Sequence, residues 1–217
     1  ISSSPTGRVS SGPPGSAHRD LRSFAPVPFW SWNEQMRLDE VAEQTRQIEL
    51  GGWGGAFIHA RMGLTIPYLG EAWFGAVTHA LDAAIANRLN VWLYDEDTWP
   101  SGFSGGTVPA RGARFRMKAL IARPVGGAFP EHCEPVGPAR SGIQVYCWTA
   151  PLGNPWFYGS SYSDLMEPDA VEAFLNDAYA RYHARYREHY GKLITAQFTD
   201  EPAPIFRLGV PHVAMPF

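Results

Sequence analysis

The sequence contains little cysteine, little net charge and no long hydrophobic run. Cys133 and Cys147 are its two cysteines, and their spacing leaves open whether they pair in an oxidising compartment or stay free. The formal net charge of −3 gives no electrostatic reason to expect a nucleic-acid partner. No apolar run approaches the roughly twenty residues that a membrane-spanning helix needs, so we expect no membrane partner.

The first 25 residues contain few apolar side chains and are rich in Ser, Gly and Pro. Such a segment buries too little apolar surface to offset its ordering entropy, so residues 1–25 are predicted to be a disordered leader. The chain begins at Ile1 with neither an initiator Met nor a signal-peptide pattern, as a processed or truncated product would. Residues 26–217 are long enough for one domain with one substantial core.

Apolar runs and helical periods alternate through most of this domain. Strands are predicted at 28–33, 55–61, 91–97 and 193–201, and helices at 38–50, 71–88 and 168–190. This alternation is typical of βα units on a parallel sheet. No helical period is found from about 103 to 163, where antiparallel strands are predicted at 116–122 and 142–148, so this segment is interpreted as a small β insertion after strand three. The tyrosines of the last helix are expected to fill core and grooves; they are Tyr179, Tyr182, Tyr186 and Tyr190.

Each predicted strand of the βα pattern ends in polar residues. They are Asn33, His59, Arg61, Asp95, Glu96, Asp97, Asp200 and Glu201. If the strands are parallel, these residues share one edge, which is where a (β/α)8 barrel has its active site. The predicted fold class is therefore α/β, the first half (about four βα units) of a TIM-type (β/α)8 barrel. A doubly wound sheet is the rival fold, but no Gly-rich phosphate loop follows the first strand, which disfavours nucleotide binding.

Four motifs occur along the chain in a fixed order: PFWSWN at 28–33, GAFIHARMGL at 55–64, WLYDEDTWPSG at 92–102 and FTDEP at 198–202. Together they resemble glycoside hydrolase family 106, the α-L-rhamnosidase-like enzymes, and their close glycosidase relatives. The resemblance implies a catalytic (β/α)8 barrel, an inverting mechanism with a glutamate acid and a glutamate base, and calcium. It also implies an oligosaccharide or polysaccharide substrate and a secreted or periplasmic location. Members of the family are far longer, so the C-terminal half of the barrel, with the base, is expected to be missing here.

Hydrolysis of a glycosidic bond usually uses two carboxyl groups, about 6.5–9.5 Å apart in inverting enzymes and about 5–5.5 Å apart in retaining ones. By the resemblance, Glu201 is the general acid, and the neighbouring charge of Asp200 is expected to raise its pKa. The candidate substrate-binding residues are Asn33, His59, Arg61, Asp95, Glu96, Asp97 and Trp99. Strand alternation predicts that Asp95 and Asp97 face one side and Glu96 the other. Trp32 and Trp99 are candidates for stacking on sugar rings or for packing under the insertion.

Two other functions stay open. The first is a non-catalytic carbohydrate-binding remnant or pseudoenzyme, which the sequence downstream of Phe217 would distinguish from an enzyme: four more βα units with a strand-end Glu favour the enzyme. The second is a metal-dependent barrel hydrolase that uses His59, Asp95, Asp97 and Glu201. It is disfavoured because strand one has no His pair and the His residues lack ligand spacing. Apart from the calcium of the resemblance, no cofactor is expected, and no metal ligand is assigned.

Overall fold

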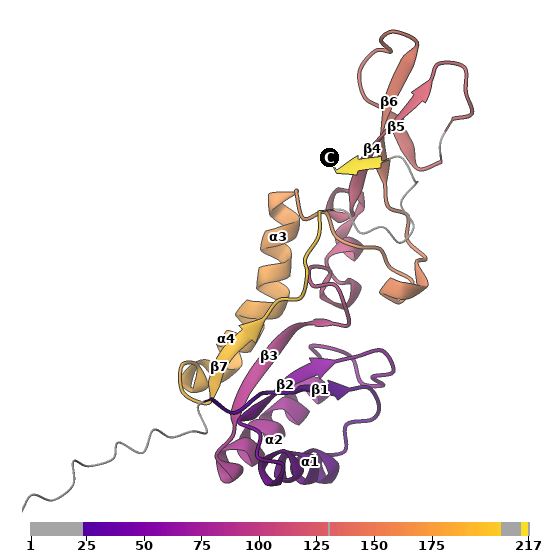
Figure 1. The fold of residues 1–217 in the computed structure, drawn as a ribbon. Helices are drawn as coiled ribbons and strands as arrows, with labels where there is room; N and C mark the ends of the chain where they lie inside the picture. Colours follow the sequence, from indigo (N-terminus) through magenta and orange to yellow (C-terminus); the bar gives the residue numbers. More distant parts are fainter. Residues whose placement is uncertain (1–23, 130, 205–213, 217) are drawn as a thin grey trace, which may run out of the picture.

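The computed structural model describes residues 24–129 and 131–204, and the backbone of residues 214–216 (Figure 1). Apart from its last two residues, the predicted leader lies outside the described residues. Figure 1 shows a parallel sheet with two helices beneath it, a β insertion at the opposite end, and a long helical run that connects these two parts.

Four strands form an all-parallel sheet that follows the order of the sequence. They are β1 (Phe29–Trp32), β2 (Gly55–Ala60), β3 (Asn90–Asp97) and β7 (Ile194–Phe198), in the order β1-β2-β3-β7. The four predicted strands are confirmed, although β7 ends at Phe198 and its two acids lie in the loop that follows. The chain is thus a mixed α/β protein with a parallel sheet and alternating β/α units.

Three helical segments accompany these strands. Helices α1 (Leu38–Leu50) and α2 (Glu71–Asn87) confirm the first two predicted helices. The third is a run of α3 (Pro168–Leu175), a π-helical turn η6 (Asn176–Ala180), α4 (Arg181–Tyr186) and η7 (Arg187–His189). The π turn, which a 3.6-residue pattern does not reveal, carries Tyr179. None of the helices in the described ranges is long and apolar enough to cross a membrane.

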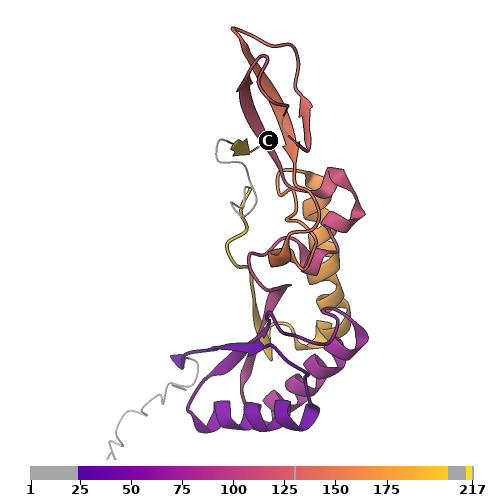
Figure 2. The same ribbon diagram turned by 90° about the vertical axis from the view of Figure 1, so that its right-hand side faces the viewer.

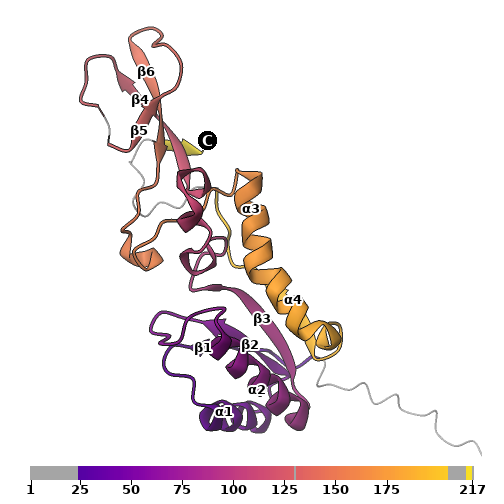
Figure 3. The same ribbon diagram turned by 180° about the vertical axis from the view of Figure 1, so that it is seen from behind.

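Helices α1, α2 and α4 pack against one face of the parallel sheet, as Figures 1 and 3 show for α1 and α2, whereas α3 packs against Val108 of the segment that follows β3. Ile58 and Leu93 of the strands belong to the same buried cluster as Val41 of α1, much of α2, and Tyr182 of α4. This confirms the expected core role of that tyrosine. Because α1, α2 and α4 share one face, the other face of the parallel sheet is covered by aromatic side chains of its own strands.

Trp32 belongs to the helix-facing core. Its ring lies 5.2 Å from the ring of Trp73, and it has almost no exposed surface. Packing therefore accounts for Trp32, and it does not reach a sugar ring.

Aromatic rings stack on the second face of the sheet. The ring centroids of Phe29 and Phe57 are 4.7 Å apart, those of His59 and Tyr94 are 3.6 Å apart, and those of Tyr94 and Phe198 are 5.8 Å apart. Phe29, on edge strand β1, remains 51 % exposed. The rings cover most of this face and lead towards the carboxyl-terminal ends of the strands.

The segment between β3 and α3 forms the insertion, which Figure 2 shows projecting from the sheet. It consists of three short 3-10 turns, η2 (Ser104–Gly106), η3 (Pro109–Arg111) and η4 (Ala113–Phe115), then β4 (Lys118–Pro124), β5 (Cys133–Pro135), β6 (Ile143–Thr149) and the turn η5 (Pro155–Phe157). With β8 (Ala214–Pro216), the strands form an antiparallel sheet of order β5-β6-β4-β8. The predicted antiparallel pair is confirmed as β4 and β6. The three-residue strands β5 and β8 are too short to show a pattern in the sequence.

Cys133 and Cys147 are free thiols on neighbouring strands. Cys133 is paired with Trp148, and Glu134 is paired with Cys147. Because side chains alternate along a strand, the two thiols point to opposite faces of the small sheet and do not form a disulfide. Cys133 packs instead in the core of the insertion.

Gly55→Ala is expected to destabilise the fold, because β2 and β3 approach too closely for a side chain. A Cβ atom at Gly55 would lie 2.2 Å from the backbone oxygen of Asn90. The strands would have to separate, at a cost of about 1–3 kcal/mol or more. Gly75→Ala in α2 is the matched control, since Gly75 is exposed and a Cβ there meets nothing within 4 Å.

The control should stabilise the protein by about 0.5–1 kcal/mol through helix propensity. Urea unfolding of both variants measures the difference. Equal unfolding free energies for the two variants would contradict the close approach of the strands.

Candidate active site

The carboxyl-terminal ends of β3 and β7 point towards the insertion (Figure 1). Between the pairs Ile58–Leu93 and Ala60–Asp97, β2 advances by two residues and β3 by four. β3 therefore bulges where its acids lie. As a result, the three consecutive acids have three separate surroundings instead of the simple two-sided alternation that the sequence predicts.

The carboxylate of Glu96 is completely buried and is bonded by backbone N–H groups. Its two oxygens accept the N–H groups of Asp97 and residues 102–105 at distances of 2.6 to 3.0 Å. Positive φ angles at Ser104 (51°) and Gly105 (60°) help these N–H groups to converge, as in an anion-binding nest. Glu96 is predicted to bind substrate; with no exposed surface, it instead holds the loop after β3.

Burial acts to raise the pKa of Glu96, and the N–H donors oppose that rise. Three donors on one oxygen and two on the other leave no lone pair that would carry a proton without losing a bond. The arrangement of N–H donors in the loop therefore fits the ionised carboxylate of Glu96.

The carboxylate of Asp95 is also completely buried, and three hydroxyl groups bond it. Ser101 donates to Oδ1 at 2.5 Å, and Tyr179 and Thr199 each donate to Oδ2 at 2.6 Å. Burial raises the pKa of Asp95, and the hydroxyl bonds oppose that rise. The donors come from the loop after β3, the π turn and the residue after β7, so Asp95 joins these segments rather than facing a substrate as predicted.

Ser101 connects Asp95 to the acidic end of β7. Its Oγ accepts the N–H of Asp200 at 2.9 Å, and its own N–H donates to the carbonyl of Asp200 at 2.9 Å. The hydroxyl of Tyr94 donates to Oδ2 of Asp200 at 2.7 Å. The residue before Glu201 is thus fixed through both its backbone and its side chain.

His59 is a buried imidazole stacked on Tyr94. Burial, aided by the charge of Arg61, lowers the pKa of His59 to about 3, so the ring is neutral. Neither ring nitrogen has a hydrogen-bond partner among the residues that the structure describes. Arg61 is partly exposed and Asn33 is exposed, both just past the ends of their strands. Arg61 is also close enough to Tyr158 for its charge to act on that phenol.

Glu201 is exposed at the rim, where Trp99 contacts it. The indole Nε1 of Trp99 donates to Oε2 of Glu201 at 3.1 Å. Glu201 has a φ of 43°, a left-handed conformation that is strained for a residue other than glycine. The carbonyl of Trp99 accepts a hydrogen bond from Nε1 of Trp156 at 2.7 Å. The two indoles therefore connect the candidate acid with the insertion.

A polar pocket of about 440 Å³ lies between the loop 64–68, the loop after β3 and the insertion. Asp97, Ser104, Thr107 and Tyr158 supply polar side chains to it. The hydroxyl of Tyr158 lies 3.5 Å from Oδ1 of Asp97, a long and weak hydrogen bond. Burial raises the pKa of Asp97 to about 6. The buried Oγ of Ser104 has no partner among the described residues. The pocket thus offers a carboxyl group that titrates near neutral pH beside hydroxyl groups.

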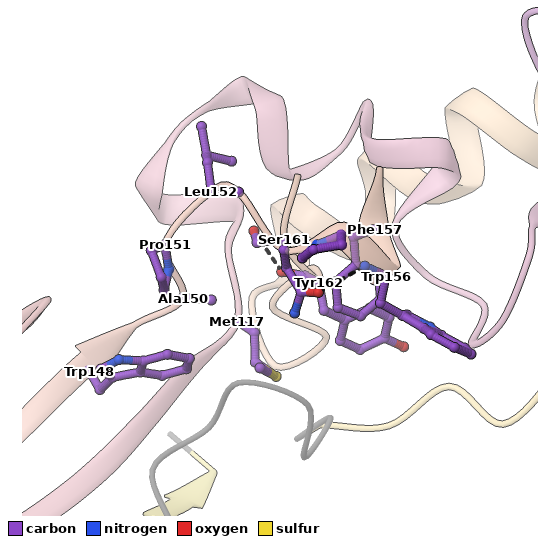
Figure 4. Close-up of a pocket in the computed structure, with 12 residues that line it drawn as sticks. Met117, Trp148, Ala150, Pro151, Leu152, Trp156, Phe157, Ser161 and Tyr162 are labelled. Carbon is purple, nitrogen blue, oxygen red and sulfur yellow. Dashed lines mark hydrogen bonds between the residues drawn. The ribbon is translucent and has the colours of Figure 1, made fainter. Parts of the chain in front are cut away.

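A second cavity, the aromatic pocket, has a volume of about 570 Å³ and lies within the insertion (Figure 4). Its lining residues are Met117, Trp148, Ala150, Pro151, Leu152, Gly153, Asn154, Pro155, Trp156, Phe157, Ser161 and Tyr162. The turn 155–158 lines both cavities, because its first three residues face the aromatic pocket and Tyr158 faces the polar pocket.

The acids at this edge do not fit a metal site. Within the described ranges, no group of three or more His, Cys, Asp or Glu side chains is arranged to hold an ion. The oxygens of Asp95 and Glu96, which calcium would favour, are occupied by hydroxyl and N–H donors. The calcium of the resemblance stays a prediction, and no step of a mechanism is derived through it.

Sequence reasoning missed the hydroxyl groups that hold the rim. Ser101 and Thr199 lie within two of the quoted motifs, so the motifs themselves contained the signal. Tyr179 is predicted as core filler, but the π turn directs its hydroxyl to Asp95. Tyr158 and Trp156 lie in a segment without any periodic pattern, and only the folded insertion brings them to the two pockets.

Comparison with known proteins gives little further information. No family model matches the chain, and no curated protein matches it. Among solved structures, a rhamnosidase from Novosphingobium sp. PP1Y matches with 17 % sequence identity and a TM-score of 0.37. The match covers 57 % of this chain and 12 % of that chain, so the present chain spans a small part of that protein. The likeness is a distant structural one.

Glu96→Gln is expected to destabilise the protein by about 2–3 kcal/mol, because an amide NH₂ would face buried N–H donors that now bond a carboxylate. Glu172→Gln on α3 is the matched control, since Glu172 is exposed and the same change there should cost less than about 0.5 kcal/mol. Urea unfolding at neutral pH compares the two. An equally small effect of both changes would show that the nest does not hold the loop.

Asp97→Asn is expected to flatten the pH dependence of stability between about pH 4 and 6. The pKa of Asp97 is raised from 3.8 to about 6 in the folded protein, so the folded state binds more protons than the unfolded state in this window. The free energy of unfolding of the unchanged protein should therefore fall as pH rises through the window. Relative to the variant, the fall should be on the order of 1–2 kcal/mol after screening by solvent. Parallel pH profiles of the two proteins would contradict it.

Proposed function

We propose that this chain is the first half of the catalytic (β/α)8 barrel of an α-L-rhamnosidase-like glycoside hydrolase. In this proposal Glu201 is the general acid of an inverting hydrolysis. The general base, and the strands that close the barrel, belong to residues that this sequence does not include. The substrate is an oligosaccharide or polysaccharide, bound at the carboxyl-terminal edge of the parallel sheet.

The sequential strand order supports the barrel. Four parallel strands lie in the order β1-β2-β3-β7, and the buried residues of α1, α2 and α4 join one cluster on a single face. A doubly wound sheet instead reverses its strand order and carries helices on both faces. A (β/α)8 barrel keeps sequential order and places every helix outside. The aromatic second face corresponds to the packed interior of such a barrel.

The surroundings of Glu201 support its role as the acid, and this is the observation that carries the proposal. It is exposed at the strand-end edge, while Asp200 beside it is fixed by Ser101 and Tyr94. The indole of Trp99 donates to Oε2 of Glu201 and orients the carboxyl group. A positioned acid at this edge can protonate the leaving glycosidic oxygen.

The polar pocket supports binding of sugar hydroxyls. A carboxylate such as that of Asp97 accepts hydrogen bonds from hydroxyl groups, and Tyr158 offers a hydroxyl group of its own. Arg61 lies near Tyr158 and adds a donor at the rim. In this proposal Asp97, Arg61 and Trp99 keep their predicted binding roles, as does Asn33 at the end of β1. Buried His59 stacks on Tyr94, whose hydroxyl bonds Asp200 beside the candidate acid.

Asp97 is the second candidate for the acid. Burial raises its pKa to about 6, so it keeps its proton to a higher pH than an ordinary aspartate, which favours a general acid. It is only partly exposed, whereas Glu201 is freely exposed at the rim. The dependence of turnover on the leaving group distinguishes Glu201 from Asp97 as the general acid.

Glu201→Gln is expected to reduce turnover strongly for a poor leaving group and only mildly for a good one. The amide keeps the shape of the side chain but supplies no proton, and general acid catalysis typically contributes about 10²–10⁴-fold. Assayed in the polypeptide that includes the remaining strands, the variant should lose this factor on a substrate with a sugar leaving group. On a nitrophenyl glycoside the loss should be mild, because nitrophenolate leaves without protonation.

The control is Asp97→Asn on the same two substrates. Equal losses on both substrates for Glu201→Gln, with a leaving-group dependence for Asp97→Asn, would transfer the acid role to Asp97. If neither variant depends on the leaving group, both candidates are excluded. A polypeptide that binds oligosaccharide but hydrolyses no glycoside would support the carbohydrate-binding alternative instead.

A further inference from the structure

We propose that the aromatic pocket of the insertion binds an uncharged, planar, apolar ring that forms the leaving group of the substrate. The inference rests on the proposed glycosidase function and adds the chemical class of the group on the far side of the scissile bond. The pocket belongs to the insertion and not to the rim of the parallel sheet, and none of the candidate residues predicted from sequence lines it.

The size and walls of the pocket match a ring-sized ligand. Its volume of about 570 Å³ lies within the range of about 300–1,000 Å³ found for small-molecule sites. In Figure 4, Trp148 lies on one side of the cavity, and Trp156 and Phe157 lie on the other. Leu152, which is 50 % exposed, stands at the mouth. Flat rings and aliphatic side chains of this kind favour offset and edge-to-face packing against a planar ligand.

Three polar side-chain atoms of the pocket already have partners within the protein. The side-chain oxygen of Asn154 accepts the N–H of Trp156 at 3.0 Å, and Ser161 donates to the carbonyl of Tyr162 at 3.3 Å. The hydroxyl of Tyr162 donates to the carbonyl of Ser101 at 2.6 Å. A sugar ring placed here would lose hydrogen bonds to water without regaining them, which opposes its binding. An apolar ring has no such hydrogen bonds to lose when it enters the pocket.

Among the residues that the structure describes, no charged side chain lines the pocket. A charged ligand would lose its hydration in the pocket and find no counter-ion there, which would greatly weaken its binding. The occupant that fits this surface is therefore neutral as well as apolar.

The pocket is connected to the candidate acid through two indoles. Trp156 forms part of the pocket wall, and its Nε1 donates to the carbonyl of Trp99 at 2.7 Å. The Nε1 of Trp99 in turn donates to Oε2 of Glu201 at 3.1 Å. A ring held against Trp156 is thus close to the residue that would protonate the oxygen joining that ring to the sugar. In this proposal the sugar itself lies in the polar pocket, and Tyr158 of the same turn 155–158 lines that pocket.

Binding of coumarin, a neutral planar ring, to the 217-residue chain tests the inference without any turnover. Ligand-observed NMR titration should show saturable binding, and Leu152→Asp should weaken it by about tenfold or more, because the new charge stands at the pocket mouth. Leu175→Asp is the matched control, since Leu175 is 46 % exposed on α3 outside the pocket, and it should leave binding unchanged. D-Glucose should not compete with coumarin.

Absence of coumarin binding, or binding that both variants weaken equally, would overturn the inference. So would competition by D-glucose, which would indicate a sugar subsite. In the longer polypeptide, Leu152→Asp should raise KM for a coumarin glycoside about tenfold and leave a methyl glycoside unaffected; equal changes for both would remove the pocket from leaving-group binding. If Glu201→Gln shows no leaving-group dependence while coumarin still binds, the proposed acid fails and the pocket stands as a ring-binding site.

Discussion

The buried carboxylate of Asp95 is the constraint on which the rim of the parallel sheet depends. A carboxylate removed from water costs several kcal/mol unless hydrogen bonds replace its hydration. Hydroxyl groups of Ser101, Tyr179 and Thr199 provide those bonds, and each belongs to a different segment of the chain. Because Ser101 also bonds the backbone of Asp200, the same constraint extends along the chain to the residue before Glu201.

Some of the acids at this rim hold neighbouring segments together, and the others face solvent or a pocket. Side by side in one environment they would repel one another and raise each other's pKa. The bulge in β3 avoids this by giving Asp95 hydroxyl partners and Glu96 backbone partners, while Asp97 opens into a pocket. The two acids that follow β7 differ in the same way, since Asp200 is bonded on several sides and Glu201 is exposed. Acids that are bonded within the structure thus lie beside acids that are accessible, and the bonded ones hold the accessible ones in place, as a preorganised site requires.

The regular part of the fold could be predicted from sequence, because burial repeats there with a known period. The strand of Gly55 to Ala60 and the helix of Leu38 to Leu50 show such patterns, and both are found at the predicted places. The candidate site was predictable only as a set of polar strand ends. The roles within it depend on the bulge in β3 and the π turn at Tyr179, which shift side chains without leaving a periodic signal. For this reason the sequence placed Glu96 beside a substrate, whereas the folded loop surrounds it with N–H groups.

The turn 155–158 lines both cavities, so the insertion contributes side chains to each of them. Asn154 holds the turn by accepting the N–H of Trp156 at 3.0 Å, and Trp156 is held in turn by the carbonyl of Trp99 at 2.7 Å. Tyr158 follows Trp156 by two residues and lines the polar pocket beside Asp97. Because Trp156 and Tyr158 belong to one short turn, the position of Tyr158 depends on how Trp156 is held. In the proposed function, the parallel sheet provides the carboxyl groups and the insertion determines which substrate is bound beside them, as loops on a rigid scaffold commonly do.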